Sequence, residues 1–384
     1  MTGRVSTAAP ARLVLNPRSR PSDIPAPGRQ AFEWHRSLPG YCPTPLRSLP
    51  SLAESLGLER LLVKDESSRF DLPSFKALGA SWTTRQLLRE HRGTRIDALV
   101  AASDGNHGHA VAAVARERGL DAVIYLPPAA VPARVDAIRK TGARVITVPG
   151  TYDDAVSAAA AHAARFGSAL LVTDTSVSAA DPSARATIDG YATIFWEIGD
   201  QLARAGLEQP DLVMLQVGVG GLAAAGVRHF RAEPTPQVMV GVEPLDAAPA
   251  FESLRSGGPV RVDLPARAGR MVGLEAGVVS AAAWPSLRDG LDAAVAISDV
   301  WCSQAIEGLV DVGIATLPTG AAGLAGLLAL AAMDRRPKGL VWRGSALVIV
   351  TEGDDGSGLA WGPPSRRRFQ WDTTWTQQRT LRRT

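Results

Sequence analysis

The chain has 384 residues and a formal net charge of +3, with 46% hydrophobic and 21% charged residues. This composition is ordinary for a globular protein and excludes a mostly disordered chain. The length predicts one large or two smaller α/β domains. No stretch approaches the ~20 unbroken apolar residues of a membrane helix, and the polar start of the chain lacks the apolar region of a secretory signal. We therefore expect no association with a membrane.

Charge pattern and cysteine content narrow the function classes further. Acidic residues interleave with the arginines along the body of the chain, so the sequence shows no basic stripe that would bind nucleic acid. The two cysteines, Cys42 and Cys302, exclude a disulfide framework or a cysteine metal cage and favour a reducing, cytoplasmic location. Residues 361–384 are rich in arginine, and we interpret them as a solvated basic tail, with a partner-binding arm as the alternative.

The predicted elements alternate between strands and helices. Residues 1–30, rich in proline, arginine and serine, are predicted to be a flexible lead-in. A strand-like run at residues 61–64 follows. Next come apolar runs with helical segments between them, a pattern typical of a parallel sheet flanked by helices. The strands are predicted at residues 98–102, 123–126, 145–148 and 170–173, and the helices at residues 108–118, 132–140 and 153–165.

A second set of elements follows and completes the predicted fold. Its strands are predicted at residues 212–216, 238–242 and 346–350, and its helices at residues 188–205, 301–312 and 321–333. We predict an α/β fold with two doubly wound parallel sheets. Residues 31–95 and 190–360 are predicted to form a large domain, and residues 96–185 a small inserted domain.

A glycine-rich turn lies between a predicted strand and a predicted helix. It contains Gly218, Val219, Gly220 and Gly221. Glycines allow the backbone to approach an anion closely, and a helix N-terminus offers free N–H groups, so the turn suits a phosphate. Glycine turns also occur for packing alone. The spacing is not Gly-x-Gly-x-x-Gly and the turn lacks the lysine and hydroxyl of an NTP-binding loop, which disfavours both nucleotide interpretations.

Lys76 stands among apolar and small residues in a chain whose positive charge is nearly all arginine. Lysine forms a Schiff base and arginine does not, and burial activates a lysine for this chemistry. Lys76 is therefore a candidate nucleophile. The alternative is a surface lysine at the start of a helix.

Polar side chains follow the predicted strand at residues 98–102. Ser103, Asp104, Asn106 and His107 lie in this turn, at the carboxyl end of a strand, where open α/β sheets bind ligands. Asn106 is suited to hold an anionic or phenolate oxygen, and Asp104 to transfer protons. A turn that caps the next helix would explain Asp104 or Asn106, but not the whole cluster.

Two more polar groups occupy equivalent places. Asp174 follows the strand predicted at residues 170–173, where a helix-capping role is equally consistent with the local sequence. Thr351 follows the last predicted strand and begins the sequence Thr-Glu-Gly-Asp. We therefore expect both to lie near the other polar turns.

Together these motifs resemble a known family. The resemblance rests on the motifs at residues 64–67, 74–79, 104–108, 218–221 and 351–354, supported by residues 43–46 and 190–193. In order and content they are similar to the tryptophan-synthase-β-like (fold type II) pyridoxal-phosphate enzymes, and within these to diaminopropionate ammonia-lyase. The Asp-Gly-Asn-His-Gly loop and the Thr-Glu-Gly-Asp ending favour the lyase over threonine dehydratase. The resemblance spans about residues 40–355.

The resemblance implies a role for each matched position and a cofactor in the cleft between two domains. Lys76 would bind pyridoxal phosphate covalently. Asn106 would contact the ring hydroxyl of the cofactor and Thr351 its ring nitrogen, while residues 218–221 would hold its phosphate. The other positions would serve the small amino-acid substrate: catalytic Asp104 and Asp174, and substrate-binding Ser103 and His107. A homodimer is the family expectation, and no metal is expected.

The implied reaction is the elimination of ammonia from 2,3-diaminopropionate to pyruvate and ammonia. A β-amino group leaves poorly unless it is protonated, and two carboxylates suit that need. The chain departs from the family pattern at residues 273–277, where Glu275 is added and a cysteine is missing, and at residues 317–323, which lack an acidic residue. Elimination on serine or threonine, or β-replacement in a specialised pathway, therefore remains an alternative.

Overall fold

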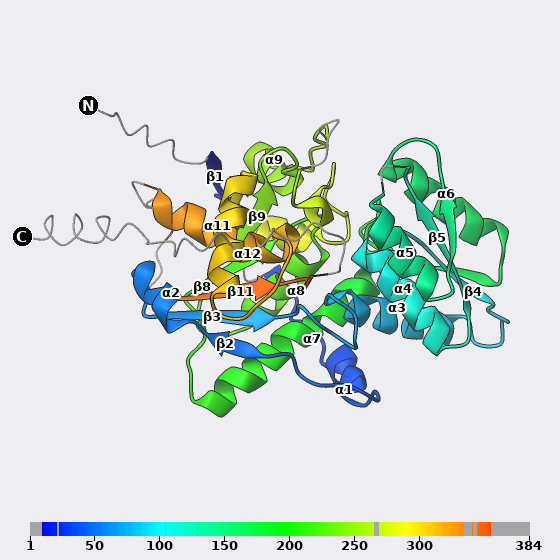
Figure 1. The fold of residues 1–384 in the computed structure, drawn as a ribbon, viewed down its shortest axis with the longest axis horizontal. Helices are drawn as coiled ribbons and strands as arrows, with labels where there is room; N and C mark the ends of the chain where they lie inside the picture. Colours follow the sequence, from blue (N-terminus) through cyan, green and yellow to red (C-terminus); the bar gives the residue numbers. More distant parts are fainter. Residues whose placement is uncertain are drawn as a thin grey trace, which may run out of the picture.

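Two separate sheets organise the chain (Figure 1). The computed structural model describes residues 10–20, 23–103, 105–128, 130–264, 269–333, 340 and 344–354. The basic tail predicted at residues 361–384 lies outside these residues. Among the described residues, no helix is both long and apolar enough to cross a membrane.

The larger sheet has seven strands in the order β1-β10-β9-β8-β11-β3-β2. The five central strands run parallel, and the edge strands β1 and β2 pair antiparallel with their neighbours. The strands are β1 (Ala11–Leu15), β2 (Leu46–Ser48), β3 (Arg60–Asp65), β8 (Leu212–Gln216), β9 (Val238–Pro244), β10 (Ala293–Ile297) and β11 (Ser345–Val350).

The smaller sheet has four parallel strands in the order β6-β5-β4-β7. They are β4 (Ala98–Ala102), β5 (Asp121–Leu126), β6 (Arg144–Thr147) and β7 (Ala169–Leu171). All four fall within residues 96–185, the range predicted for the inserted domain. The exact domain limits stay a prediction.

Helices cover both faces of each sheet, as expected for a doubly wound fold. In β8, Leu212 and Met214 pack in the cluster that contains α11 and α12, while Val213 and Leu215 pack with α7, α8 and α10. The α/β class predicted from the sequence is confirmed. The helices are α1 (Gln30–Arg36), α2 (Pro50–Ser55), α3 (Lys76–Glu90), α4 (Asn106–Glu117), α5 (Pro132–Lys140), α6 (Tyr152–Arg165), α7 (Pro182–Ala205), α8 (Gly221–Phe230), α9 (Pro249–Ser256), α10 (Trp284–Gly290), α11 (Asp299–Val310) and α12 (Pro318–Ala332), with a short 3-10 turn at Val272–Leu274.

Helices α4 and α7 are among those that begin earlier in the chain than predicted. Helix α4 begins at Asn106, so Asn106 and His107 form its first turn rather than a preceding loop. Helix α7 begins at Pro182, six residues before the predicted start, because Asp181 accepts a hydrogen bond from the Ala184 N–H (2.8 Å) and proline suits the first helical position. The earlier start of α4 places the site residues Asn106 and His107 on a rigid element.

The flexible lead-in predicted for residues 1–30 is wrong where the structure describes it. Strand β1 pairs antiparallel with β10 from Ala11 to Leu15, and α1 begins at Gln30. Leu13 packs against the cluster on one face of the sheet and Val14 against the cluster on the other. The buried Asn16 then donates hydrogen bonds to two carbonyls at the end of α10 (2.7 Å each). The strand gains its structure from the sheet edge, which composition alone does not reveal.

A buried ionic cluster joins β3 to α7. It consists of Lys64, Glu66, Arg69 and Glu197, each no more than 2% exposed. The Lys64 Nζ lies 2.7 Å from Glu197 Oε2, and Arg69 contacts both Glu66 (2.6 Å) and Glu197 (2.7 Å). Two cations and two anions balance each other, which is the condition for burying charge at tolerable cost.

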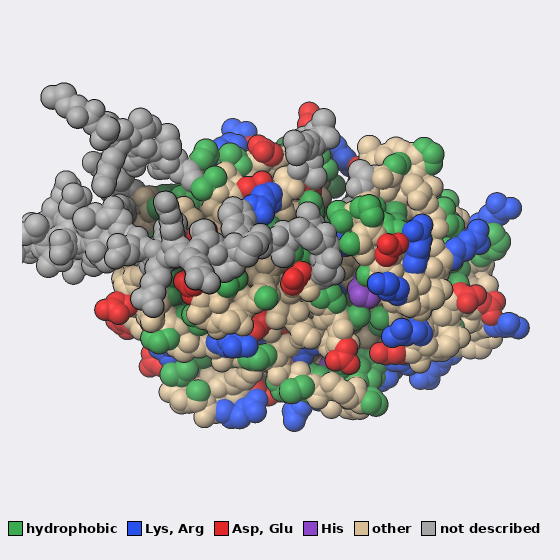
Figure 2. Space-filling view, in the orientation of Figure 1, with side chains coloured by type: hydrophobic (Ala, Val, Ile, Leu, Met, Phe, Trp, Pro, Cys, Tyr) green, Lys and Arg blue, Asp and Glu red, His purple; other side chains and the backbone are tan. Residues whose placement is uncertain are grey.

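Surface charges are mixed in sign. On the face drawn in Figure 2, lysine and arginine side chains are interspersed with aspartate and glutamate. Many of the exposed charges are paired across short distances, such as Arg139 with Asp136 (3.4 Å) and Arg95 with Asp97 (2.7 Å). The described residues on this face therefore present no extended surface of one sign.

Helices α3 and α7 approach closely at two glycines. A Cβ on Gly79 would lie 2.5 Å from the Tyr191 ring, and a Cβ on Gly190 would lie 2.6 Å from the Leu78 carbonyl oxygen. The second contact is with backbone, which has little freedom to move. The contact matters for the site because α3 begins with Lys76 and α7 carries Tyr191.

We predict that Gly190→Ala destabilises the protein by about 1–3 kcal/mol, because its methyl group overpacks against the α3 backbone. The measurement is the melting temperature, which should fall. Gly199→Ala in the same helix is the matched control, since a Cβ there meets no atom of the described residues closer than 3.9 Å. Alanine favours a helix over glycine, so the control should keep or raise the melting temperature. An unchanged melting temperature for Gly190→Ala would show that α3 and α7 can shift apart at this contact without a loss of stability.

Candidate active site

A cavity of about 400 Å³ lies where the carboxyl ends of both sheets meet. Open α/β sheets bind ligands at this edge. Elements of both sheets contribute, and every described residue that the sequence analysis singled out as a site residue lines it: Lys76, Ser103, Asn106, His107, Asp174, Gly218, Val219, Gly220, Gly221 and Thr351. Asp104 lies outside the described residues.

Lys76 opens α3 and forms an ion pair with Asp174. The Lys76 Nζ lies 2.7 Å from Asp174 Oδ2, and 21% of the lysine side chain is exposed, within the lining of the cavity. Burial alone would lower the pKa of Lys76, but the Asp174 carboxylate raises it above its ordinary value. Burial would raise the pKa of Asp174, but the positive charge of Lys76 holds it below its usual range. In this state both groups are therefore charged.

Asp174 does not cap a helix. The N-cap of α7 is Asp181, whereas Asp174 directs its carboxylate at Lys76. The capping alternative that remained open for Asp174 is therefore wrong. Asp174 follows β7 and is almost fully buried, so the strand and its packing hold the carboxylate in place.

His107 lies beside this pair with one nitrogen already engaged. Its Nε2 hydrogen-bonds the Val172 carbonyl (3.1 Å), which requires the hydrogen on Nε2 and leaves Nδ1 as an acceptor. Nδ1 is buried, lies 3.9 Å from Asp174 Oδ2, and has no hydrogen-bond partner within the described part of the chain. Burial and the nearby Lys76 charge lower the pKa of His107, so the imidazole is neutral.

The Asn106 side chain lies in the first turn of α4 and does not cap this helix. The N-cap of α4 is Gly105, and its N–H donates to Ser103 Oγ (3.2 Å). Asn106 instead donates from Nδ2 to Glu352 Oε2 (2.5 Å). The capping alternative for Asn106 is therefore wrong, and its side chain is directed across the cavity lining.

The glycine turn connects β8 to α8. Gly220 has φ +98°, a left-handed conformation that favours glycine, and it caps α8. A Cβ on Gly220 would lie 2.9 Å from Leu287, and one on Gly218 would lie 3.3 Å from the Gly273 carbonyl. Glycines thus allow a tight turn, and the first N–H groups of α8 lack partners within the helix. The turn and the helix end suit an anion.

Thr351 follows β11, and its hydroxyl oxygen accepts a hydrogen bond. Gln216 Nε2 donates to Thr351 Oγ1 (3.3 Å) and to the Ile349 carbonyl (2.8 Å). Because the Thr351 oxygen accepts from Gln216, its own hydrogen is available to donate into the cavity. A ring nitrogen with a free lone pair is a matching acceptor.

Several residues of the cavity were not predicted as site residues from the sequence. Arg134 on α5, Tyr191 on α7, Gln216 at the end of β8 and Glu352 line it. Tyr191 and Glu352 appeared only within the motifs at residues 190–193 and 351–354. The position of Gln216 and Glu352 at strand ends was an available signal. No local pattern points to Arg134, because its partner is distant in the chain.

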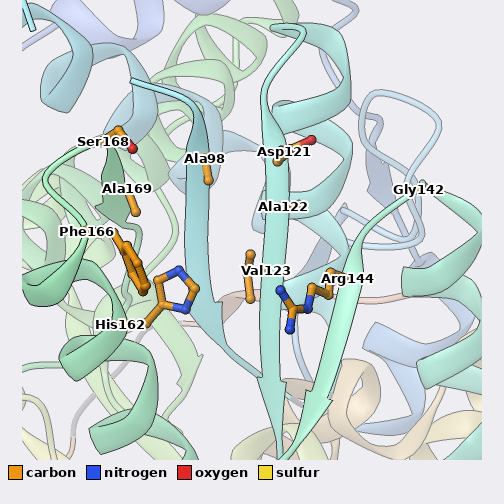
Figure 3. Close-up of a pocket in the computed structure, with 10 residues that line it drawn as sticks. All are labelled: Ala98, Asp121, Ala122, Val123, Gly142, Arg144, His162, Phe166, Ser168 and Ala169. Carbon is orange, nitrogen blue, oxygen red and sulfur yellow. The ribbon is translucent and has the colours of Figure 1, made fainter. Parts of the chain in front are cut away.

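A second hollow, of about 450 Å³, lies at the amino ends of the small sheet (Figure 3). Its lining shares no described residue with the first cavity. His162 and Arg144 border it, and His162 Nδ1 is hydrogen-bonded to Tyr125 (2.7 Å). The hollow holds none of the predicted site residues that the structure describes.

The comparison with protein families is decisive. The family model of the pyridoxal-phosphate dependent enzymes matches residues 38–352. The chain belongs to this family. Pyridoxal phosphate is accordingly its cofactor, as the resemblance implied.

Curated relatives and solved structures agree with this family. The diaminopropionate ammonia-lyase of Escherichia coli K12 is 32% identical over 372 residues, covering 88% of this chain and 92% of the relative. A crystal structure of the E. coli lyase in complex with an aminoacrylate-PLP azomethine reaction intermediate matches with a TM-score of 0.82 and 30% identity, covering 91% of this chain and 95% of that one. A second crystal structure of the E. coli lyase, in complex with D-serine, matches with a TM-score of 0.81 and 28% identity, over 91% and 95% of the two chains.

The side chains of the cavity fit the cofactor of this family. A phosphate suits the tight glycine turn at the start of α8, and an aldehyde suits the Lys76 amine. The Thr351 hydroxyl is free to donate, and the Asn106 amide offers a donor for a ring oxygen. The cavity volume of about 400 Å³ lies within the usual range of ligand sites, ~300–1,000 Å³.

We predict that Asp174→Asn shifts the capture of pyridoxal phosphate to lower pH. Only a neutral amine attacks an aldehyde, and the Asp174 carboxylate raises the pKa of Lys76, so removing it increases the neutral fraction at a given pH. The rate of capture, followed by visible absorbance after mixing with apoprotein between pH 6 and 9, should rise with pH in both proteins and should be higher in the variant at each pH. The exposed Asp136→Asn is the control. Equal rates across this pH range would mean that Asp174 does not control this proton.

Proposed function

We propose that this protein is an ammonia-lyase that eliminates ammonia from 2,3-diaminopropionate to give pyruvate and ammonia. The observation that carries the proposal is the Lys76–Asp174 pair, 2.7 Å apart, on a cavity that also holds Asn106, the glycine turn and Thr351. Relatives named diaminopropionate ammonia-lyase support it, because they align over most of the chain.

The cofactor is bound, on this proposal, by residues from both sheets. Lys76 attaches it, residues 218–221 and the α8 N-terminus hold its phosphate, Asn106 contacts its ring hydroxyl, and Thr351 donates to its ring nitrogen. When bound, pyridoxal phosphate delocalises negative charge from the substrate Cα and so makes the Cα–H acidic. The protein contributes orientation, charge balance and proton transfer.

Proton transfer is assigned to one lysine and two carboxylates. The Lys76 Nζ would take or return a proton at the substrate Cα. Asp174, buried beside Lys76, holds the β-ammonium group of the substrate, keeps it protonated and so makes it a leaving group. Asp104 is assigned a second proton-transfer role from its place in the sequence before Asn106. Ser103 and His107 are assigned to the substrate.

A second candidate reaction is elimination on serine or threonine, or β-replacement. Threonine dehydratases are among the relatives, one of them 35% identical over 226 residues. Glu275, absent from the family pattern, lines the same cavity and accepts a hydrogen bond from the Gly269 N–H. An added carboxylate at the cavity edge is consistent with a substrate other than diaminopropionate.

Assembly and location are also part of the proposal. Homodimers are the expectation for this family. A reducing, cytoplasmic location is supported by two free thiols, the exposed Cys42 and the buried Cys302.

We predict that borohydride reduction of the holoprotein labels Lys76. The cofactor should become fixed to the peptide that contains Lys76, because this lysine lines the cavity. Peptide mapping by mass spectrometry is the measurement. Lys76→Arg is the control and should bind no cofactor covalently, since arginine forms no Schiff base. Label on Lys64 or Lys140 would overturn the assignment.

We predict that 2,3-diaminopropionate is the preferred substrate in a panel with serine, threonine and O-substituted serines. Diaminopropionate releases two molecules of ammonia per pyruvate and serine releases one, so parallel assays of both products identify the reaction. Full activity on serine with none on diaminopropionate would reverse the ranking of the two reactions.

We predict that Asp174→Asn keeps the spectrum of the bound cofactor and loses about 10²–10⁴-fold in turnover. A near-normal rate with a lowered melting temperature would reduce Asp174 to a structural role.

A further inference from the structure

The backbone of Glu352 is held in place just beyond the end of strand β11. Thr316 Oγ1 donates to the Glu352 carbonyl (2.5 Å), and the Gly353 N–H donates to the Pro73 carbonyl (3.0 Å). Glu352 also forms a bridge with Ser74, two residues before Lys76. The starting point of the Glu352 side chain is therefore fixed relative to Lys76.

The Glu352 carboxylate crosses to helices that flank the other sheet. Its Oε2 accepts a hydrogen bond from Asn106 Nδ2 on α4 (2.5 Å) and lies 3.9 Å from Arg134 Nη2 on α5. Glu352 is 2% exposed and Arg134 is 7% exposed. Burying a carboxylate is costly unless a cation and hydrogen bonds compensate it. Arg134 supplies the cation and Asn106 a hydrogen bond.

This contact determines how the Asn106 amide is oriented. An ionised carboxylate only accepts hydrogen bonds, so it must face the NH₂ group of Asn106. The flipped amide would place its carbonyl oxygen against the carboxylate, and the two acceptors would repel each other. One N–H therefore serves Glu352, and the second N–H remains as a donor for another acceptor.

We propose that Glu352, with Arg134 as its counter-ion, is a positioning residue that holds the Asn106 amide as a hydrogen-bond donor to the ring hydroxyl of pyridoxal phosphate. The proposal rests on the cofactor assignment made above and is independent of which amino acid is the substrate. It gives the glutamate of the Thr-Glu-Gly-Asp motif a role distinct from that of Thr351. The contact with Asn106 joins the end of a strand of the seven-stranded sheet to a helix that flanks the four-stranded sheet.

The test is a double-mutant cycle on cofactor binding. Apoprotein is titrated with pyridoxal phosphate for wild type, Glu352→Gln, Asn106→Ala and the double variant, and binding is followed by quenching of the nine tryptophans. The absorption spectrum of the bound cofactor is recorded against pH for each protein. Glu352→Gln keeps the shape of the side chain but removes its charge, so the amide is free to flip.

Glu352→Gln should weaken binding about tenfold when Asn106 is present, the effect expected for one misdirected hydrogen bond. In the Asn106→Ala background the same change should weaken binding less than about twofold, the usual limit for uncoupled sites. The pH profile of the absorption band should likewise move only when Asn106 is present. Equal losses in both backgrounds would overturn the proposal, because they would show that Glu352 acts on stability alone.

The experiment distinguishes failure of the cofactor assignment from failure of the role proposed for Glu352. If wild-type apoprotein captures no pyridoxal phosphate, the cofactor assignment fails before the cycle is measured. If Glu352→Gln does not fold, Glu352→Asp replaces it, since the shorter side chain retains the charge but loses reach to Asn106. If Glu352→Asp leaves binding unchanged relative to its parent protein in both backgrounds, the proposal is also overturned.

Discussion

The position of Lys76 depends on the buried ionic cluster of Lys64, Glu66, Arg69 and Glu197. Glu66 and Arg69 belong to the segment that leads from β3 to α3, and Glu197 belongs to α7. Because unpaired charges are costly in a dry interior, these four groups have to remain in contact. The cluster thus ties the start of the Lys76 segment to α7, and the backbone of Ser74 and Pro73 ties its end to the strand-end residues after β11. The lysine is presented by a segment held at both ends.

The active-site cavity exists because two sheets direct their carboxyl ends at each other. The seven-stranded sheet contributes the glycine turn after β8 and Thr351 after β11, and the four-stranded sheet contributes Ser103 after β4 and Asp174 after β7. Helices α3 and α7 connect the two halves through a crossing at which glycine is required by close approach. Each sheet alone supplies only part of the cavity lining. The proposed chemistry therefore depends on the contacts that hold the two sheets together.

The sequence predicted the parts of this arrangement that are local. Apolar runs located the parallel strands, and polar groups at strand ends identified Asn106, Asp174 and Thr351. Strand β1 was missed because a short run in a proline-rich segment gains its structure only from the sheet edge. The contact of Glu352 with Arg134 was also missed. Two charged residues that are distant in the chain leave no periodic pattern or fixed spacing in the sequence. Local sequence patterns do not reveal such contacts between residues that are distant in the chain.

The charge balance at Lys76 gives a physical reason to prefer a diamino acid. Asp174 is buried, and in the structure its countercharge is the Lys76 ammonium. When Lys76 acts as a base its nitrogen is neutral, and the carboxylate then needs another cation. The protonated β-amino group of diaminopropionate supplies one at the leaving position, whereas the hydroxyl of serine or threonine supplies none. A neutral His107, whose Nδ1 only accepts hydrogen bonds, does not replace that cation. On the proposed function, a substrate with a second amino group would therefore balance the carboxylate that the Lys76 ammonium balances in the structure.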